Sequence, residues 1–169
     1  MADGVFGVEV VTPEESLLAG GATSVVLTNS DGDLTVLDGH TALVSDVVPC
    51  QTKVEQPDGT TLLLAVHGGF LQVDTSPGAA EGLAEGDGPL PGLSTKVTVL
   101  AGVAELSDQI DVPRAQAAKE AAEARVAELS SGRGGPADQA DVEDLALTEA
   151  EATLARAELR LSVAAGSPD

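Results

Sequence analysis

Two histidines and five arginines are the side chains of this 169-residue sequence whose types could do chemistry. His40 lies in the stretch GDLTVLDGHTALV, residues 32–44, beside a glycine and between two apolar alternating runs. A histidine placed there either transfers protons or shapes a turn that presents a sheet edge to a partner. Because no G-x-S-x-G nucleophile motif accompanies it, the setting favours the turn. A hydrolase that uses His40 without partners is the rival hypothesis.

Motifs for metals and phosphates are missing from the sequence. His40 and His67 form no H-x-x-H or H-x-x-x-H pair, and Cys50 is the single cysteine. Neither G-x-G-x-x-G nor G-K-[ST] occurs. The sequence therefore predicts no metal site, no internal disulfide and no catalytic residue.

The arginines of the last third could bind an anion. Arg156 and Arg160 are four residues apart and project from one helix face. Arg114 falls in the first turn of a preceding helix, where exposed N–H groups also favour anions. If the two helices fold back on each other, these groups could converge on a polyphosphate. The alternative, which the spacing alone favours, is ion pairing with neighbouring acids on a solvated face.

Composition excludes several classes of partner. The net charge of −20 disfavours binding to nucleic acid and direct binding to an anionic membrane. No basic segment followed by a long apolar run begins the chain, and no apolar stretch approaches the ~18 residues of a membrane helix. We therefore expect a protein on the cytosolic side of the membrane. Residues 1–110 contain 16 acidic and 2 basic side chains, and residues 111–169 contain 12 and 6. This asymmetry indicates two modules with different partners.

Short alternating runs predict strands in the first 100 residues. They cover 6–11, 25–28, 34–37, 42–44, 53–55, 61–66, 70–73 and 96–100, with turn residues between them. Such strands without intervening helices are typical of a sandwich or barrel. The segment 75–94 has five glycines and three prolines, and we expect it to be a flexible surface loop.

From Asp108 onward the apolar spacing changes to three and four residues. Asp111 can cap a first helix, and Pro113 is tolerated in its first turn. A second helix is expected from about residue 141. The two apolar faces are rich in alanine: Ala115, Ala118, Ala122, Val126 and Leu129, then Leu147, Ala150, Leu154, Ala157 and Leu161. Alanine buries little area, so the helix pair should depend on its docking surface.

The predicted fold is therefore α+β with two modules. Residues 1–106 are expected to form an antiparallel β-sandwich of about ten short strands. Residues 107–169 are expected to form an antiparallel α-helical hairpin.

Three blocks in order resemble the epsilon subunit of F-type ATP synthases. Residues 32–44 are similar to the family's G-x-x-G-[VI]-x-P-G-H-A-P-L-[LV] segment, with Thr35, Asp38 and Thr41 departing from it. HGGFLQV, residues 67–73, and KVTVLA, residues 96–101, resemble two of its strands. The resemblance covers nearly the whole chain.

This resemblance implies a non-catalytic rotor subunit that couples proton translocation to ATP synthesis. The sandwich would bind the gamma subunit and the c-ring through Asp33, Asp38, Gly39, His40, Thr41, Ala42 and Leu43. The extended hairpin would restrain ATP hydrolysis by contacting the alpha and beta subunits, and the folded hairpin would release the brake. The subunit would be peripheral, at the cytoplasmic face of the cell membrane, and would reach the membrane only through the complex.

A fourth block, IDVPRA at residues 110–115, resembles the I/L-D-x-x-R-A motif of epsilon subunits that bind ATP. The implied site comprises Glu105, Ile110, Asp111, Arg114, Ala115, Arg156 and Arg160. A further arginine of the family's first helix is Ala121 here. No cofactor is implied as a requirement, but the alternative function is ATP sensing, with nucleotide stabilising the folded hairpin.

Overall fold

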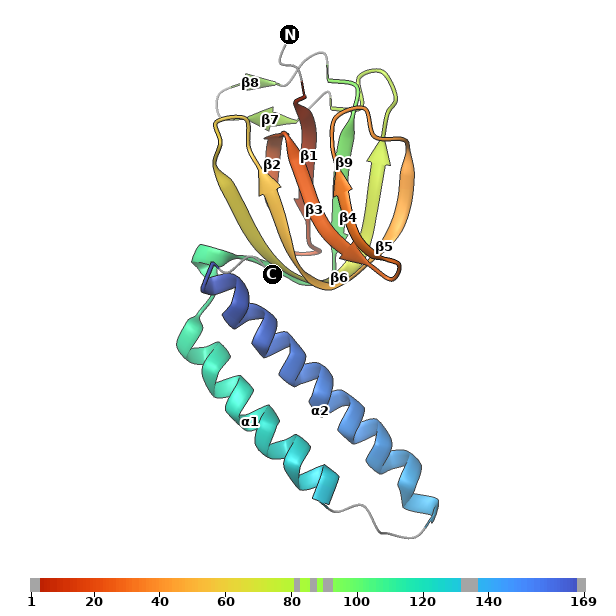
Figure 1. The fold of residues 1–169 in the computed structure, drawn as a ribbon, viewed down its shortest axis with the longest axis vertical. Helices are drawn as coiled ribbons and strands as arrows, with labels where there is room; N and C mark the ends of the chain where they lie inside the picture. Colours follow the sequence, from red (N-terminus) through yellow and green to blue (C-terminus); the bar gives the residue numbers. More distant parts are fainter. Residues whose placement is uncertain (1–3, 81–82, 86–87, 90–92, 132–136, 167–169) are drawn as a thin grey trace. The chain divides into compact units, whose positions relative to one another are not determined.

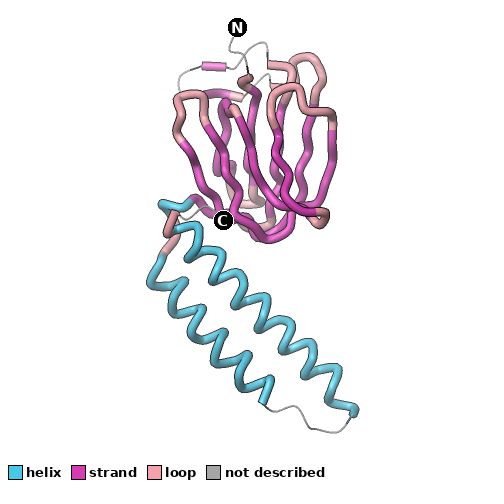
Figure 2. Tube along the Cα trace, in the orientation of Figure 1, coloured by secondary structure: helices cyan, strands magenta, loops and turns pink. Residues whose placement is uncertain are grey.

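The computed structural model describes residues 4–80, 83–85, 88–89, 93–131 and 137–166. The chain divides into one unit over Met1–Ser107 and a second over Asp108–Asp169. Figure 2 shows the strands in the first unit and the two long helices in the second. The predicted fold class, a β-sandwich followed by a helical hairpin, is confirmed.

A single large sheet builds the first unit. The strands of this sheet are β1 (Phe6–Val11), β2 (Ser16–Ala22), β3 (Ser24–Asn29), β4 (Gly32–Val36), β5 (Leu43–Glu55), β6 (Thr61–Asp74), β9 (Lys96–Ala101) and β10 (Ala104–Leu106). A separate small sheet is formed by β7 (Ala84–Glu85) and β8 (Gly88–Pro89). Among the described residues, the large sheet has the order β2-β1-β9-β6-β5-β3-β4, with β10 paired to β6, while β7 pairs with β8. The β1–β9 pair is parallel, unlike the antiparallel pairs that we expected throughout.

The long strands β5 and β6 fold this sheet onto itself. Their antiparallel register runs up to Val47↔Gly69 and resumes at Pro49↔His67. The first half of β6 pairs with β10 and the second half with β9. One continuous sheet therefore supplies both layers of the sandwich, which lie one behind the other in Figure 1.

The alternation of buried and exposed residues along β6 changes where the sheet folds over, between His67 and Gly69. We call this place the corner. Leu64 and Val66 face the core before it, whereas Leu71 and Val73 face the core after it, so the buried positions change from even to odd. A strand alternates strictly, so a change of parity requires an irregular step in the backbone. Gly68 supplies it with a φ of +101°, which a side chain would disfavour.

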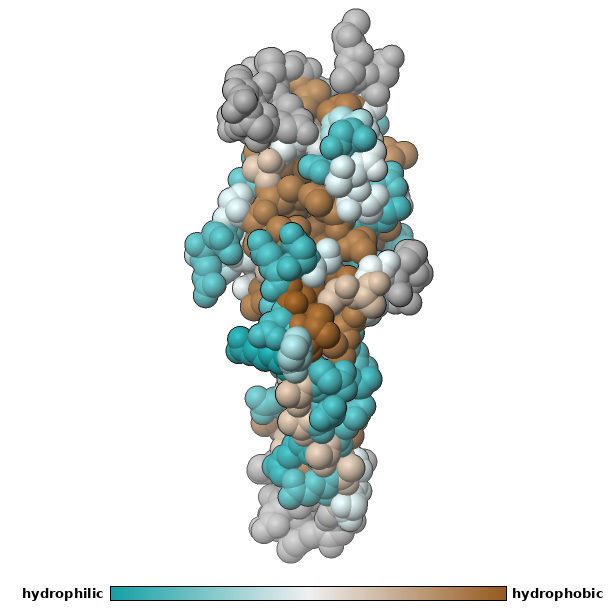
Figure 3. Space-filling model, turned by 90° about the vertical axis from the view of Figure 1, so that its left-hand side faces the viewer, coloured by the Kyte–Doolittle hydropathy of each residue, from teal (hydrophilic) through white to brown (hydrophobic). Residues whose placement is uncertain are grey.

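The core between the layers is aliphatic apart from Phe6. Its fully buried large side chains are Phe6, Val8, Val10, Val25, Leu27, Val36, Val54, Leu64, Val66, Leu71, Val97 and Val99. Valine dominates this set, as expected for a chain with almost no aromatic residues. On the side of the molecule shown in Figure 3, the sandwich surface has a broad apolar area, whereas the hairpin surface is mostly hydrophilic or neutral.

Part of the segment 75–94 packs against the sandwich. Ala80 and Leu83 are buried. A Cβ built on Gly7 of β1 would lie 2.8 Å from the Ala80 Cβ and 2.7 Å from the Leu83 Cδ1. Gly7 therefore leaves the space that these side chains occupy. The flexibility expected of this segment stays a prediction, while Ala80 and Leu83 within it are buried against β1. Residues 81–82, 86–87 and 90–92 of this segment lie outside the described chain.

Glu55 at the end of β5 makes stability depend on pH. Lys53 Nζ lies 2.7 Å from one carboxylate oxygen, and the Ser24 hydroxyl donates a hydrogen bond of 2.9 Å to the other. Lys53 first, and then Ser24, hold the pKa of Glu55 below its ordinary value of 4.5. Because the folded pKa is the lower one, this stabilisation is complete above pH 4.5 and is lost as the pH falls through the folded pKa.

We therefore expect Glu55→Gln to be less stable than the original chain near pH 7, with a smaller difference at pH 3, because the stabilisation declines as the pH falls toward the lowered folded pKa. The measurement is the urea midpoint of unfolding, followed by circular dichroism, at both pH values. Asp58→Asn is the matched comparison, because Asp58 has its pKa lowered by the Thr60 backbone N–H and has no cation beside it. A stability difference of the same size at both pH values would contradict the assignment.

The second unit is a pair of antiparallel helices, α1 (Val112–Ser131) and α2 (Ala137–Ala164), preceded by a 3-10 turn over Ser107–Gln109. They lie side by side in Figure 1. The predicted alanine-rich faces are the buried ones, with Ala115, Ala122, Leu147, Ala150 and Ala157 buried. The second helix begins at Ala137, before the predicted start near residue 141.

Candidate functional site

His40 closes a tight turn after β4. Its backbone N–H donates to the Leu37 carbonyl at 3.1 Å, and Gly39, the third residue of the turn, has a φ of +76°. Glycine in this position is the requirement of a type II turn. The His40 Nδ1 lies 2.8 Å from the Thr41 carbonyl, so this nitrogen carries the hydrogen. These contacts orient the imidazole within a turn and supply no nucleophile for it to activate.

The residue that follows the segment 75–94 in the sequence supports this turn. Thr95 is almost completely buried. Its carbonyl accepts a hydrogen bond of 2.9 Å from the Gly7 N–H, and its hydroxyl accepts one of 3.4 Å from the Gly39 N–H. Thr95 therefore connects the turn to β1 and to the start of β9.

Asp33 lies at the opposite end of β4 from the turn. It is exposed, and its carboxylate accepts a hydrogen bond of 3.0 Å from the Thr28 hydroxyl. With roughly 3.3 Å per residue in a strand, Asp33 and Asp38 are roughly 15 Å apart. The structure groups Asp38, Gly39 and His40 in the turn, with Thr41–Leu43 leading into β5, but it does not place Asp33 among them.

His67 is buried in β6, with 3% of its side chain exposed. Its Nε2 lies 3.6 Å from a carboxylate oxygen of Glu105 on β10, and the backbone N–H of His67 donates to the Val103 carbonyl at 3.0 Å. The sequence singled out both residues, but nothing in it linked them, because they meet only when β10 pairs with β6. The pair joins the last strand of the sandwich to the sheet.

The residues of the IDVPRA block form the start of α1. The Asp111 carboxylate accepts a hydrogen bond of 3.0 Å from the Arg114 N–H, and the Asp111 carbonyl accepts one of 2.9 Å from the Ala115 N–H. Asp111 is therefore the N-cap of the helix, as the sequence predicted. Ile110 and Ala115 are buried, and the Arg114 residue is exposed.

The other two predicted arginines lie on the second half of α2. Arg156 is exposed, and its guanidinium donates to the Thr153 hydroxyl at 3.3 Å, while Arg160 is half-buried. The Lys119 ammonium lies 3.2 Å from the Glu158 carboxylate, so Lys119 of α1 lies opposite Glu158 of α2. The antiparallel arrangement therefore brings the start of α1 and the end of α2 to the same end of the hairpin. ATP binding at these residues stays a prediction.

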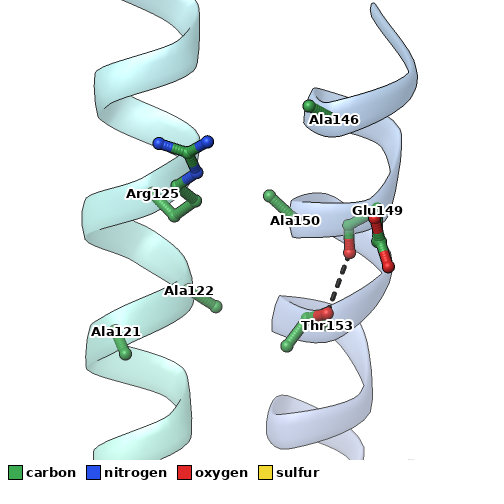
Figure 4. Close-up of a pocket in the computed structure, with 7 residues that line it drawn as sticks. All are labelled: Ala121, Ala122, Arg125, Ala146, Glu149, Ala150 and Thr153. Carbon is green, nitrogen blue, oxygen red and sulfur yellow. Dashed lines mark hydrogen bonds between the residues drawn. The ribbon is translucent and has the colours of Figure 1, made fainter. Parts of the chain in front are cut away.

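A cavity of about 350 Å³ lies between the middle of α1 and the middle of α2. Figure 4 shows its lining, in which the Arg125 side chain runs along α1. The lining residues are Ala121, Ala122, Arg125, Ala146, Glu149, Ala150 and Thr153. Ala121 stands here where the resembling family has an arginine. Arg125 donates to Glu128 at 2.6 Å, and Glu149 lines the same space, so the lining has no excess positive charge for phosphates.

Two further features limit the chemistry of the described residues. Within these residues, no group of three or more histidine, cysteine, aspartate or glutamate side chains could hold a metal ion. None of their helices is both long and apolar enough to cross a bilayer.

Comparison with known proteins assigns both units to one family of chains. The beta-sandwich domain of ATP synthase delta/epsilon chains matches residues 5–77. The long alpha-helix domain of the same chains matches residues 108–165.

Individual relatives cover nearly the whole chain. The ATP synthase epsilon chain of Desulforapulum autotrophicum is 36% identical over 163 residues, which are 96% of this chain and 97% of that one. The epsilon chain of Bordetella petrii is 37% identical over 150 residues, covering 88% and 90%. A chain in the solved OSCP/F1/c-ring structure of Euglena gracilis mitochondrial ATP synthase superimposes with a TM-score of 0.63 at 17% identity, over 91% of this chain and 78% of that one. This last likeness supports the fold.

Proposed function

Because this chain belongs to the family of ATP synthase epsilon chains, we propose that it couples proton translocation to ATP synthesis and restrains ATP hydrolysis. It is a subunit of the central stalk and is not itself catalytic. The observation that carries the proposal is the match of two family domains, in the family's order, to the two units of the chain.

The two ends of β4 carry the predicted interface of the sandwich. Asp33 lies at the start of this strand, and the turn over Leu37–His40 follows its end. The gamma subunit and the c-ring are the partners expected for these residues. The hairpin would meet the alpha and beta subunits, and the complex would hold the chain at the cytoplasmic face of the membrane.

The direct test of the proposal is assembly with the stalk. The full chain, mixed with the purified gamma subunit of the same organism, is expected to elute from a sizing column as a one-to-one complex. The complex should then bind the isolated c-ring in a pull-down experiment. Bovine serum albumin, which is also acidic, controls for charge-driven association. Failure of the full chain to bind gamma, or turnover of ATP by the purified chain alone, would overturn the proposal.

A further inference from the structure

The connection between the sandwich and the hairpin starts at β10, the shortest strand of the large sheet. It has three residues and, among the described strands, it pairs with β6 alone. After β10 the chain passes through the turn Ser107–Gln109 into α1. A three-residue strand with one neighbour has few backbone hydrogen bonds, so it opens more easily than the long strands. How firmly β10 is held therefore depends on its side chains.

The side chains of β10 divide between the two faces of the strand. Ala104 is buried, and Leu106 is half-buried and packs against the core. Glu105 points to the other face, because successive residues of a strand alternate. It pairs directly with Ala65, two positions from His67, so Glu105 and His67 lie diagonally on one face. On this face, the carboxylate of β10 therefore lies beside the imidazole of β6.

His67 contacts both β10 and the residues that lead into it. Its Nε2 is 3.6 Å from a Glu105 oxygen, and 3% of the imidazole side chain is exposed, against 33% for Glu105. The backbone of this part of β6 is connected to the same segment, since the His67 N–H donates to the Val103 carbonyl at 3.0 Å. The Gly102 N–H donates to the Gly68 carbonyl at 3.3 Å. Opening of β10 would therefore disturb the surroundings of His67.

The neighbours of His67 on other strands are neutral or acidic. On β5, Pro49 pairs directly with His67, and Gln51 pairs with Ala65. The exposed Glu14 and Glu15 precede β2 and follow Pro13, which lines a hollow together with Gly68. Carboxylates at this end of β6 favour the protonated form of a nearby histidine.

The two lysines of the sandwich lie elsewhere. Lys53 on β5 is opposite Leu63, four residues from His67 along β6, or roughly 13 Å. Its ammonium lies 2.7 Å from the carboxylate of Glu55. Lys96 is opposite Asp74, at the far end of β6, and lies 2.9 Å from the carboxylate of Glu9. Residues 1–107 contain no arginine. The described strands of the sandwich therefore place no lysine or arginine beside the imidazole.

A proton on the imidazole changes its contact with Glu105 from that of a neutral ring into an ion pair. Histidine titrates near pH 6.5 in water, so its charge changes within the physiological range. Away from water, the attraction between an imidazolium and a carboxylate is stronger than at the surface. A proton that binds more tightly while β10 is paired stabilises this pairing at low pH. The stabilisation is complete below about pH 6.5 and is lost as the pH rises through the titration midpoint of the paired state.

We propose that His67 and Glu105 form a pH-dependent latch that holds β10 to β6 and is closed when the imidazole is protonated. The point at which the hairpin leaves the sandwich is then held more firmly in acid than at alkaline pH. The regulatory meaning of the latch rests on the proposed function, since a subunit that restrains hydrolysis through its hairpin would respond to the pH of its compartment.

The test measures hydrogen exchange of the full chain by NMR at about pH 5.5 and about pH 8, with rates corrected for the intrinsic effect of pH. Protection of the β10 amides and of the amide of residue 67 should be about fivefold greater at the lower pH, as one partly exposed ion pair allows. In Glu105→Gln, which keeps the shape of the side chain without its charge, the difference should fall below about twofold. Amides of β9, such as that of Val97, report on the sheet as a whole and should not differ between the two chains.

Two histidine variants complete the experiment. His67→Gln should remove the pH dependence of β10 protection as Glu105→Gln does. His40→Gln is the matched control, because it removes the other histidine of the chain and should leave the fivefold difference in place.

The outcomes separate the latch from the proposed function. Equal pH dependence in the original chain and in Glu105→Gln would overturn the inference. Greater protection of β10 at pH 8 than at pH 5.5 would also overturn it, because burial of the ring would then outweigh the attraction of the carboxylate. Either result leaves the proposed function standing, since the experiment uses neither the gamma subunit nor ATP hydrolysis. Conversely, a chain that shows the latch but does not bind gamma would refute the proposed function alone.

Discussion

Replacing Gly69 with alanine is expected to destabilise the sandwich by about 3 kcal/mol or more, as backbone strain and overpacking add to each other. Gly69 has a φ of +153°, in a region that residues with a side chain rarely adopt. A Cβ at this position would overlap the carbonyl oxygen of Leu100 and lie 3.0 Å from the Cα of Ala101. Both atoms belong to the backbone of β9, which cannot move without breaking its pairing with β6.

Alanine substitutions at two other glycines separate the contribution of backbone strain from that of overpacking. Gly59 has a φ of +86° but open space around its Cβ position, so Gly59→Ala should show the conformational strain alone, about 1 kcal/mol. Gly102 also has open space there and is not among the glycines of positive φ, so Gly102→Ala should be nearly neutral. The measurement is the free energy of unfolding in urea, followed by circular dichroism, because the chain has no tryptophan or tyrosine. Equal unfolding of Gly69→Ala and Gly102→Ala would show that β6 and β9 are not so closely paired at this corner.

This corner also shows where strand prediction from sequence reaches its limit. The alternating runs around Pro49 and Gly68 predicted several short strands, because proline and glycine usually interrupt strands. In the structure they lie inside two long strands, β5 and β6, at the place where the sheet folds over. A turn and a corner need the same residues, and only the pairing of distant segments decides between them. The strand β2 was not predicted for a related reason, since Gly20 and Gly21 weaken its pattern.

The helical hairpin was more predictable than the sheet. Its contacts repeat every three or four residues along each helix, so the buried faces follow from local spacing. The packing of Ala80 and Leu83 depends instead on the missing side chain of Gly7, more than 70 positions away in the sequence. No count of glycine and proline within 75–94 contains that information.

Some parts of the candidate site also follow from local sequence, whereas others depend on contacts between distant segments. The turn at His40 follows from a local glycine, and the N-cap at Asp111 follows from the helix start, so the sequence predicted both correctly. The exposure of Val44, Phe70 and Leu100 was not predicted, because a strand pattern fixes which residues alternate but not which face is covered. These residues come from β5, β6 and β9, which only the sheet order brings together.

Ending the chain after Leu106 is expected to raise ATP hydrolysis by the reconstituted ATP synthase at least fivefold, which corresponds to a coupling free energy of ~1 kcal/mol. The shortened chain keeps β10, whose residues Ala104–Leu106 pair with β6. The strands of the large sheet are therefore all present, and the sandwich should still enter the complex. What the truncation removes is the hairpin with every arginine of the chain.

A full-length variant distinguishes a charge effect from a steric one. Arg114, Arg125, Arg156 and Arg160 are the hairpin cations that an extended hairpin would place against acidic surfaces of the alpha and beta subunits. The combined change of Arg114, Arg156 and Arg160 to glutamine removes the three arginines of the predicted anion site and tests the charge effect.

If the brake is electrostatic, this variant should hydrolyse ATP nearly as fast as the truncated complex, and added salt should release the original complex too. If only the truncation releases hydrolysis, the hairpin acts by its bulk. Unchanged hydrolysis in a complex that demonstrably contains the shortened chain would mean that the hairpin does not restrain rotation at all, and the regulatory half of the proposed function would have to be given up.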